Sequence, residues 1–101
     1  MEKAKPTYDL KAFKETFSTV NRLAMTTTAL QGARELGCTR EDIVAVLQSM
    51  KREHFYKSMT SYDDHKIWQD VYHVPWDELV IYVKFTADAV SAFRILSFKE
   101  K

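Results

Sequence analysis

The stretch that decides the fold covers residues 55–72 and reads "FYKSMTSYDDHKIWQDVY". Aromatic and β-branched residues alternate there with polar ones on both sides of a polar turn, which predicts two β-strands joined as a hairpin. The alternation has one unusual feature. Gln69 stands between Ile67 and Val71, at the parity where an apolar residue is expected. A lysine and an amide, Lys57 and Gln69, thus stand on what looks like the packed face of a hairpin, and we interpret this conflict as the mark of a functional groove.

Three segments before this hairpin have the spacing of amphipathic helices. Apolar residues recur every three or four positions in residues 8–20, 27–37 and 39–54. The last segment has the clearest start, because Thr39 can cap the helix and Asp42 stands where a capping box places its acid. We therefore expect the first half of the chain to be largely helical.

After residue 54 the pattern changes to the two-residue period of strands. Strands are predicted at residues 55–62, 66–74, 78–87 and 91–99, with a turn at Asp63 and Asp64 and a connection "ADAVS" at residues 87–91. Helices followed by a run of strands are typical of an α+β fold. We expect one domain over residues 1–101, with about three helices packed on one face of a mostly antiparallel sheet of four to five strands. The other face would be open, and a site can lie there.

The composition limits the classes of function. The chain has 101 residues, of which 46% are hydrophobic and 29% charged, and its formal net charge is +1. This balance is ordinary for a globular domain and gives no general case for binding nucleic acid or a membrane, so any basic site must be local. We expect a cytoplasmic protein, because no segment resembles a signal sequence or a membrane span and the single cysteine, Cys38, cannot form an intramolecular disulfide.

Metal binding is not expected from the sequence. His54, His65 and His73 are far apart and are accompanied by no Cys/His or His/carboxylate motif. The run "DDH" at residues 63–65 is typical of a polar turn. With two glycines in the chain there is no glycine-rich phosphate loop either.

The polar positions of the β half are the candidate site. By period two, Tyr82 shares a face with Lys84, and Lys57 shares one with Met59. Lysines, a tyrosine and an amide beside exposed aromatics can hold an RNA strand by phosphate charge and base stacking. They also suit cleavage in which the ribose 2′-hydroxyl attacks the phosphate, because that reaction needs a base, an acid and cations. Nearby lysines would favour the phenolate of Tyr82.

Two other functions fit the same pattern. The chain can be a non-catalytic module that binds RNA or protein on this scaffold, or a structural subunit whose polar sheet face meets another protein. Tight RNA binding without cleavage would indicate the first.

Three segments resemble the MqsR family of toxins, the mRNA-cleaving halves of MqsR–MqsA toxin–antitoxin pairs. They are "HFYKSMTSYDDHKIWQDVY" at residues 54–72, "VIYVKF" at 80–85 and "LSFKEK" at 96–101. The resemblance is dense in the first segment and loose before residue 50. After "DVY" the family pattern continues with arginine and proline, whereas this chain has His73 followed by "VPWDEL".

The resemblance implies a RelE-like fold and a sequence-preferring mRNA endoribonuclease that uses no metal or other cofactor, inhibits translation and arrests growth. It places the catalytic lysine, glutamine and tyrosine at Lys57, Gln69 and Tyr82. Tyr82 would act as general base or acid, Lys57 as the phosphate cation, and Gln69 as a donor that positions phosphate or ribose. The residues expected to line the RNA path are Tyr56, Met59, His65, Trp68, His73, Lys84 and Lys99.

The resemblance also implies a protein partner. This would be an MqsA-like antitoxin with a zinc-binding part and a helix-turn-helix part, and operator DNA would be contacted only through that antitoxin. The zinc would belong to the antitoxin. Family members cut at GC-containing sites, so a similar preference is expected.

Overall fold

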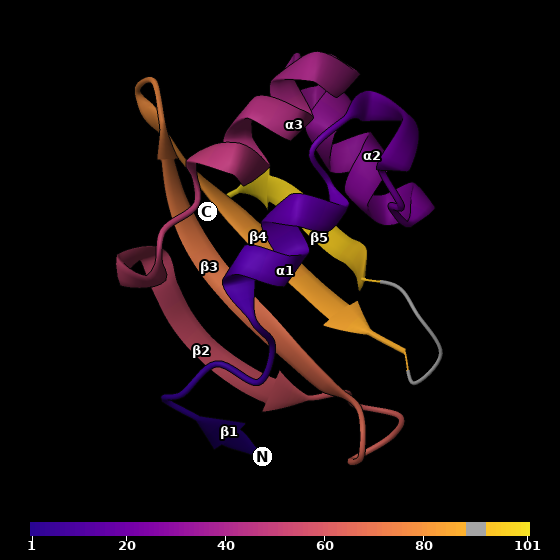
Figure 1. Cartoon of the computed structure of the whole chain (residues 1–101), viewed down its shortest axis with the longest axis vertical. Coiled ribbons are helices and arrows are strands. Elements are labelled where there is room, and N and C mark those ends of the chain that lie inside the picture. The colour runs from indigo at the N-terminus through magenta and orange to yellow at the C-terminus, as the bar shows by residue number, and fades with distance from the viewer. Residues whose placement is uncertain (89–92) are drawn as a thin grey trace.

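Over residues 1–88 and 93–101, which the computed structural model describes, the chain forms a five-stranded antiparallel sheet and three α-helices (Figure 1). The strands are β1 (Glu2–Lys3), β2 (Phe55–Thr60), β3 (Trp68–Trp76), β4 (Leu79–Ala87) and β5 (Phe93–Glu100), and the helices are α1 (Leu10–Thr16), α2 (Thr27–Glu35) and α3 (Arg40–Ser49). Two 3₁₀ turns, η1 (Val20–Arg22) and η2 (Arg52–His54), connect them. The spatial order of the strands, β1-β2-β3-β4-β5, follows the chain.

The helices lie on one side of the sheet, with α1 crossing in front of the strands (Figure 1). The core between the two layers is made of aromatic and aliphatic side chains. Phe13 of α1 stacks on Phe85 of β4 with ring centroids 3.8 Å apart, and both residues are fully buried. Ile43 and Leu47 of α3 belong to the same core cluster. The predicted α+β fold, with helices on one face of an antiparallel sheet, is confirmed.

Helix α3 begins where its capping residues were predicted. Thr39 and Asp42 form the reciprocal capping box of α3, with hydrogen bonds of 3.1 and 2.9 Å. The end of this helix was predicted wrongly, because α3 stops at Ser49 and not at residue 54. Met50 is extended, and its carbonyl accepts a hydrogen bond of 2.9 Å from Lys14 Nζ. This interaction satisfies a carbonyl that has left the helix, and it lets the chain turn toward β2.

Lys57 and Gln69, which the pattern leaves on what looks like the packed face, lie on the open face. Strand alternation places Asp70 and Tyr72, both fully buried, on the helix-bearing face, so Gln69 points to the open face. The alternation of polar and apolar residues does not identify the packed face of β3. A polar residue, Asp70, is buried against the helices, and an apolar residue, Val71, lies on the opposite face, where it is also fully buried. The hairpin itself is confirmed, although β2 ends at Thr60, β3 begins at Trp68, and the turn closes between Asp64 and Ile67. In the last hairpin, residues 89–92 of the predicted connection and strand start lie outside the described residues.

Asp70 ties the segment before α1 to the middle of the sheet. Its carboxylate accepts hydrogen bonds from the backbone N–H of Thr7, at 3.1 Å, and of Tyr8, at 2.9 Å. Next to it, the hydroxyls of Thr7 and Ser58 are 2.7 Å apart. These contacts satisfy a carboxylate that has no exposed surface.

Helix α2 comes close to β5 at Gly32. A Cβ atom added there would lie 2.1 Å from the backbone oxygen of Phe98, so only glycine allows the helix to approach the strand this closely. No helix among the described residues is both long and apolar enough to cross a membrane.

The change Asp70→Asn tests the role of the buried carboxylate. The amide keeps one acceptor oxygen but turns an N–H₂ group toward backbone N–H donors, so we expect the free energy of unfolding to fall by about 1–3 kcal/mol. Asp63→Asn in the exposed turn is the matched control and should change it by less than about 0.5 kcal/mol. Urea unfolding followed by circular dichroism measures both, and equal stabilities of the two variants would contradict this role.

Candidate functional site

A row of four side chains crosses the open face of the sheet. It consists of Tyr56 on β2, His73 on β3, Tyr82 on β4 and Lys99 on β5, and Tyr82 is the Cα partner of both His73 and Lys99. The Tyr56 and His73 rings stack with centroids 4.3 Å apart, and the His73 and Tyr82 centroids are 5.9 Å apart at a tilt of 38°. Lys99 Nζ lies 5.3 Å from the centroid of Tyr82. The row therefore offers flat rings and a cation together.

A β-bulge brings Tyr56 into this row. The register between β2 and β3 shifts between Phe55 and Lys57, so β2 has one more residue there than its partner strand. Phe55 pairs with Tyr72 on the helix-bearing face, whereas Tyr56 stacks on the open face and Lys57 pairs with Val71. The bulge thus presents two successive side chains to the same face. Strict alternation, which the sequence reasoning assumed, does not reveal it.

Lys57 lies beside the row and is held by a carboxylate from the N-terminal strand. Its Nζ donates a hydrogen bond of 2.7 Å to Glu2 Oε2, and it lies 5.5 Å from the centroid of the Tyr56 ring. The hydrogen bond to Glu2 is the largest influence on Lys57 and raises its pKa. Lys57 is therefore a fixed cation at neutral pH. Sequence reasoning missed Glu2, because nothing near residue 2 indicates a contact with residue 57.

The hydroxyl of Tyr82 stays protonated. Burial raises its pKa, and the nearby charge of Lys57 lowers it by less. The expectation that lysines favour the phenolate holds for the charge of Lys57, which lowers the pKa, but desolvation of the anion outweighs this attraction and the net pKa is raised. At neutral pH this hydroxyl therefore carries its proton and can act only as the donor in a proton transfer.

Gln69 lies at a distance from Tyr82 along the open face. It is the Cα partner of Met59 and is four positions from His73 along β3, which corresponds to roughly 13 Å along the strand. Lys57, opposite Val71, lies between these two levels. Lys57 is thus close enough to Tyr82 to influence its protonation, and it lies between the levels of Tyr82 and Gln69 on the same face.

Three other predicted RNA contacts have different surroundings. Lys84 lies on the open face opposite Ser97, and burial, followed by the charge of Lys99, lowers its pKa. Trp68 has the parity of Asp70 and so lies on the helix-bearing face, where Lys3 Nζ is 4.2 Å from its ring centroid. His65 is exposed in the turn before β3. His65 and Trp68 do not join the row, and their contact with RNA stays a prediction.

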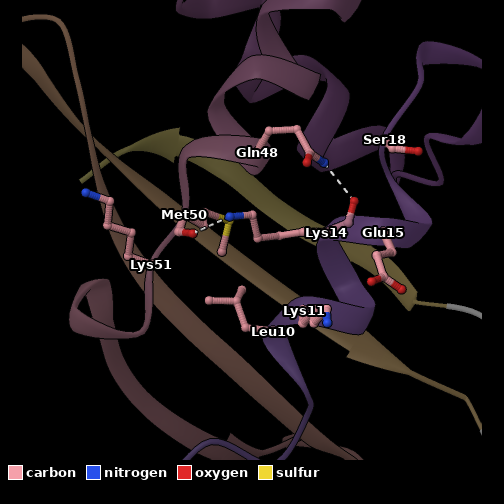
Figure 2. Close-up of a pocket in the computed structure, with 8 residues that line it drawn as sticks. All are labelled: Leu10, Lys11, Lys14, Glu15, Ser18, Gln48, Met50 and Lys51. Carbon is pink, nitrogen blue, oxygen red and sulfur yellow. Dashed lines mark hydrogen bonds between the residues drawn. The ribbon is translucent and has the colours of Figure 1, made fainter.

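A cavity of about 580 Å³ lies away from this face, between α1 and the end of α3 (Figure 2). Two hydrogen bonds cross its wall: Lys14 Nζ donates to Met50, and Gln48 Nε2 donates to the Lys14 carbonyl at 2.7 Å. It is lined by Leu10, Lys11, Lys14, Glu15, Ser18, Gln48, Met50 and Lys51, none of which is a predicted site residue. Among residues 1–88 and 93–101, no three His, Cys, Asp or Glu side chains are grouped as a metal site requires.

An α+β domain whose open sheet face combines stacked rings with lysines has the features of a protein that binds single-stranded nucleic acid. Comparison with known proteins gives the particular family. Residues 5–100 match the family described as "Motility quorum-sensing regulator, toxin of MqsA", and the chain belongs to this family. It is 38% identical over 101 residues to "mRNA interferase toxin MqsR" of Escherichia coli strain K12, with both chains covered completely. The predicted family is confirmed.

The ion pair of Lys57 with Glu2 makes a prediction about RNA binding. Glu2→Gln removes the carboxylate that competes with phosphate for Lys57, so we expect a few-fold tighter binding of an oligonucleotide blocked by 2′-deoxy substitution, with the gain lost at high salt. Glu15→Gln on α1 changes the net charge equally and is the control. Fluorescence anisotropy measures both, and an identical gain in the control would show a general charge effect.

Proposed function

We propose that this chain is the toxin of a type II toxin–antitoxin system and acts as an mRNA endoribonuclease. It cleaves messenger RNA without a metal, by attack of a ribose 2′-hydroxyl on the adjacent phosphate, and so inhibits translation and growth. The observation that carries the proposal is the pairing of a fixed cation, Lys57, with a protonated hydroxyl, Tyr82, on the open face of a chain from the MqsR family. Cleavage of this kind needs both groups.

Each group has a separate task in the proposed reaction. The ammonium of Lys57 stabilises the extra negative charge of the pentavalent phosphate. The hydroxyl of Tyr82, which its raised pKa keeps protonated at neutral pH, donates its proton to the departing 5′-oxygen. Gln69 and Met59, farther along β2 and β3, hold a neighbouring nucleotide. The ring of Tyr56, 54% exposed, is a platform for a base.

The proposed partner is an MqsA-like antitoxin that neutralises the toxin in the cytoplasm. The family description, which names a toxin of MqsA, supports this partner. A zinc-binding part and a helix-turn-helix part would belong to the antitoxin, and operator DNA would be reached only through it. The chain's own contribution is the RNA-cleaving face.

Substitution of the two paired groups tests the function. We expect Tyr82→Phe and Lys57→Ala each to slow cleavage of an mRNA fragment by about 10²–10⁴-fold, because each removes one catalytic group. The products of the unaltered protein should carry 2′,3′-cyclic phosphate and 5′-hydroxyl ends. Gel analysis of end-labelled RNA measures rates and ends together.

Matched changes elsewhere serve as controls. Tyr62→Phe, at a 98% exposed tyrosine in the β2–β3 turn, and Lys11→Ala on α1 should leave the rate unchanged. Full activity of Tyr82→Phe, ends of the opposite polarity, or loss of cleavage in EDTA would contradict the mechanism. Tight RNA binding without any cleavage would identify a binding module instead.

A further inference from the structure

The proposed reaction lacks one group. Attack by the 2′-hydroxyl requires a base that accepts its proton, and the protonated Tyr82 is suited to the opposite role. Gln69 carries an amide, which is not a base at neutral pH. The assignment of this base rests on the proposed function, and the base must lie on the same open face.

His73 is held at the centre of this face. Its ring stacks on Tyr56 with a centroid distance of 4.3 Å and a tilt of 23°, and it faces Tyr82 across the β3–β4 pair at 5.9 Å. The side chain is half-buried, so it remains open to a bound strand. The rings of Tyr56 and Tyr82 thus orient the imidazole of His73. Within residues 1–88 and 93–101, the imidazole makes no hydrogen bond that would occupy its nitrogens.

Burial first, and then the charge of a nearby lysine, favour the neutral imidazole of His73. Tyr56, Tyr82 and Lys101 interact with His73 directly. The other ionisable groups that the register places on this part of the open face are Lys57 with Glu2, Lys84 and Lys99. The carboxylate of Glu2 is engaged by Lys57, so the remaining charges are positive. Burial, followed by the charge of Lys101, lowers the pKa of His73 below 6.5. The ring therefore has a free lone pair at neutral pH.

Glu2 is the carboxylate nearest to Lys57, and it is a poorer base than His73. Its oxygen already accepts the hydrogen bond from Lys57, and that bond lowers the pKa of Glu2. A carboxylate held in this way has little tendency to take up a proton at neutral pH.

We propose that His73 is the general base of the cleavage reaction, paired across the sheet with Tyr82 as the general acid. An imidazole nitrogen of His73 takes the proton of the 2′-hydroxyl as the 2′-oxygen bonds to phosphorus. The bond from phosphorus to the 5′-oxygen breaks, and this oxygen takes the proton of Tyr82. The products are a 2′,3′-cyclic phosphate and a 5′-hydroxyl, and the imidazolium and phenolate return to their starting states by proton exchange with water.

Two substitutions at His73 separate catalysis from packing. His73→Phe keeps a ring that stacks on Tyr56 but has no lone pair, and His73→Gln keeps a polar group but is not a base. We expect both to lower kcat by about 10²–10⁴-fold with little change in KM. Circular dichroism and thermal unfolding report whether each variant is folded. Cleavage at the normal rate by a folded His73→Phe protein would overturn the proposal.

A modified substrate distinguishes the base from the acid. In RNA with sulfur in place of the bridging 5′-oxygen at the cleaved position, the leaving thiolate needs no proton, so loss of the acid is tolerated. Tyr82→Phe should recover most of its activity on this substrate, whereas His73→Gln should not. Rescue of His73→Gln alone would mean that the two roles are reversed, and rescue of neither would remove His73 and Tyr82 from the proton transfers.

The pH dependence of the rate distinguishes a base from a residue that only packs, because a purely structural role of His73 would not shift the pH profile. The rate constant kcat/KM should fall on the acid side as His73 takes up a proton, at a pH below 6.5, and NMR titration of the His73 ring should give the same pKa. Lys101→Gln removes a positive neighbour, so both values should move to higher pH, while Lys11→Gln should move neither. An acid limb that stays in place while the NMR pKa moves would overturn the role of His73.

These experiments also separate the proposal from the function on which it rests. If the unaltered protein cleaves no RNA, the proposed function fails. If it cleaves RNA with cyclic phosphate ends and the His73 variants cleave equally well, only the assignment of the base fails.

Discussion

The buried carboxylate of Asp70 is the interaction on which both faces of the molecule depend. It lies on the helix-bearing face of β3 and accepts hydrogen bonds from the backbone of Thr7 and Tyr8. These contacts fix the residues directly before α1, so the helix starts where Phe13 can reach the core. They also direct the N-terminal strand along β2, where Glu2 meets Lys57 on the opposite face. The buried carboxylate of Asp70 thus helps to position the ion pair of Glu2 and Lys57 on the open face.

Competition between burial and charge determines the chemistry of the open face. Tyr82 and Lys57 are close enough to influence each other's protonation, yet partial burial of the tyrosine keeps its proton in place. The same burial acts in the opposite sense on His73 and lowers its pKa. Desolvation favours the neutral form of every group. It therefore raises the pKa of Tyr82 and lowers the pKa of His73, and the two values move farther apart. Neighbouring charges then adjust the two values.

Local signals in the sequence predicted most of the fold. The capping box at Thr39 and Asp42, the helical spacing and the change to period two are properties of neighbouring residues, and they located the helices and the strands. What depends on distant residues was not predictable. The burial of Asp70 depends on backbone donors more than sixty positions away, and without it the parity of β3 was assigned to the wrong face. The candidate site likewise has a part that local motifs predicted and a part that depends on distant residues. Lys57, Gln69 and Tyr82 came from motifs, whereas the bulge at Tyr56 and the contact with Glu2 are long-range features.

The strand order has a consequence for the order of folding. Each of the strands β2 to β5 pairs with its neighbour in the chain, but β1 pairs with β2 across more than fifty residues, and the segment before α1 is held by β3. During synthesis the N-terminal helices emerge first and have no sheet on which to pack. Their docking must wait for the hairpin that contains Asp70, because closing such long loops is unfavourable until the non-local contacts exist. Docking of the N-terminal helices therefore depends on strands that belong to the second half of the chain.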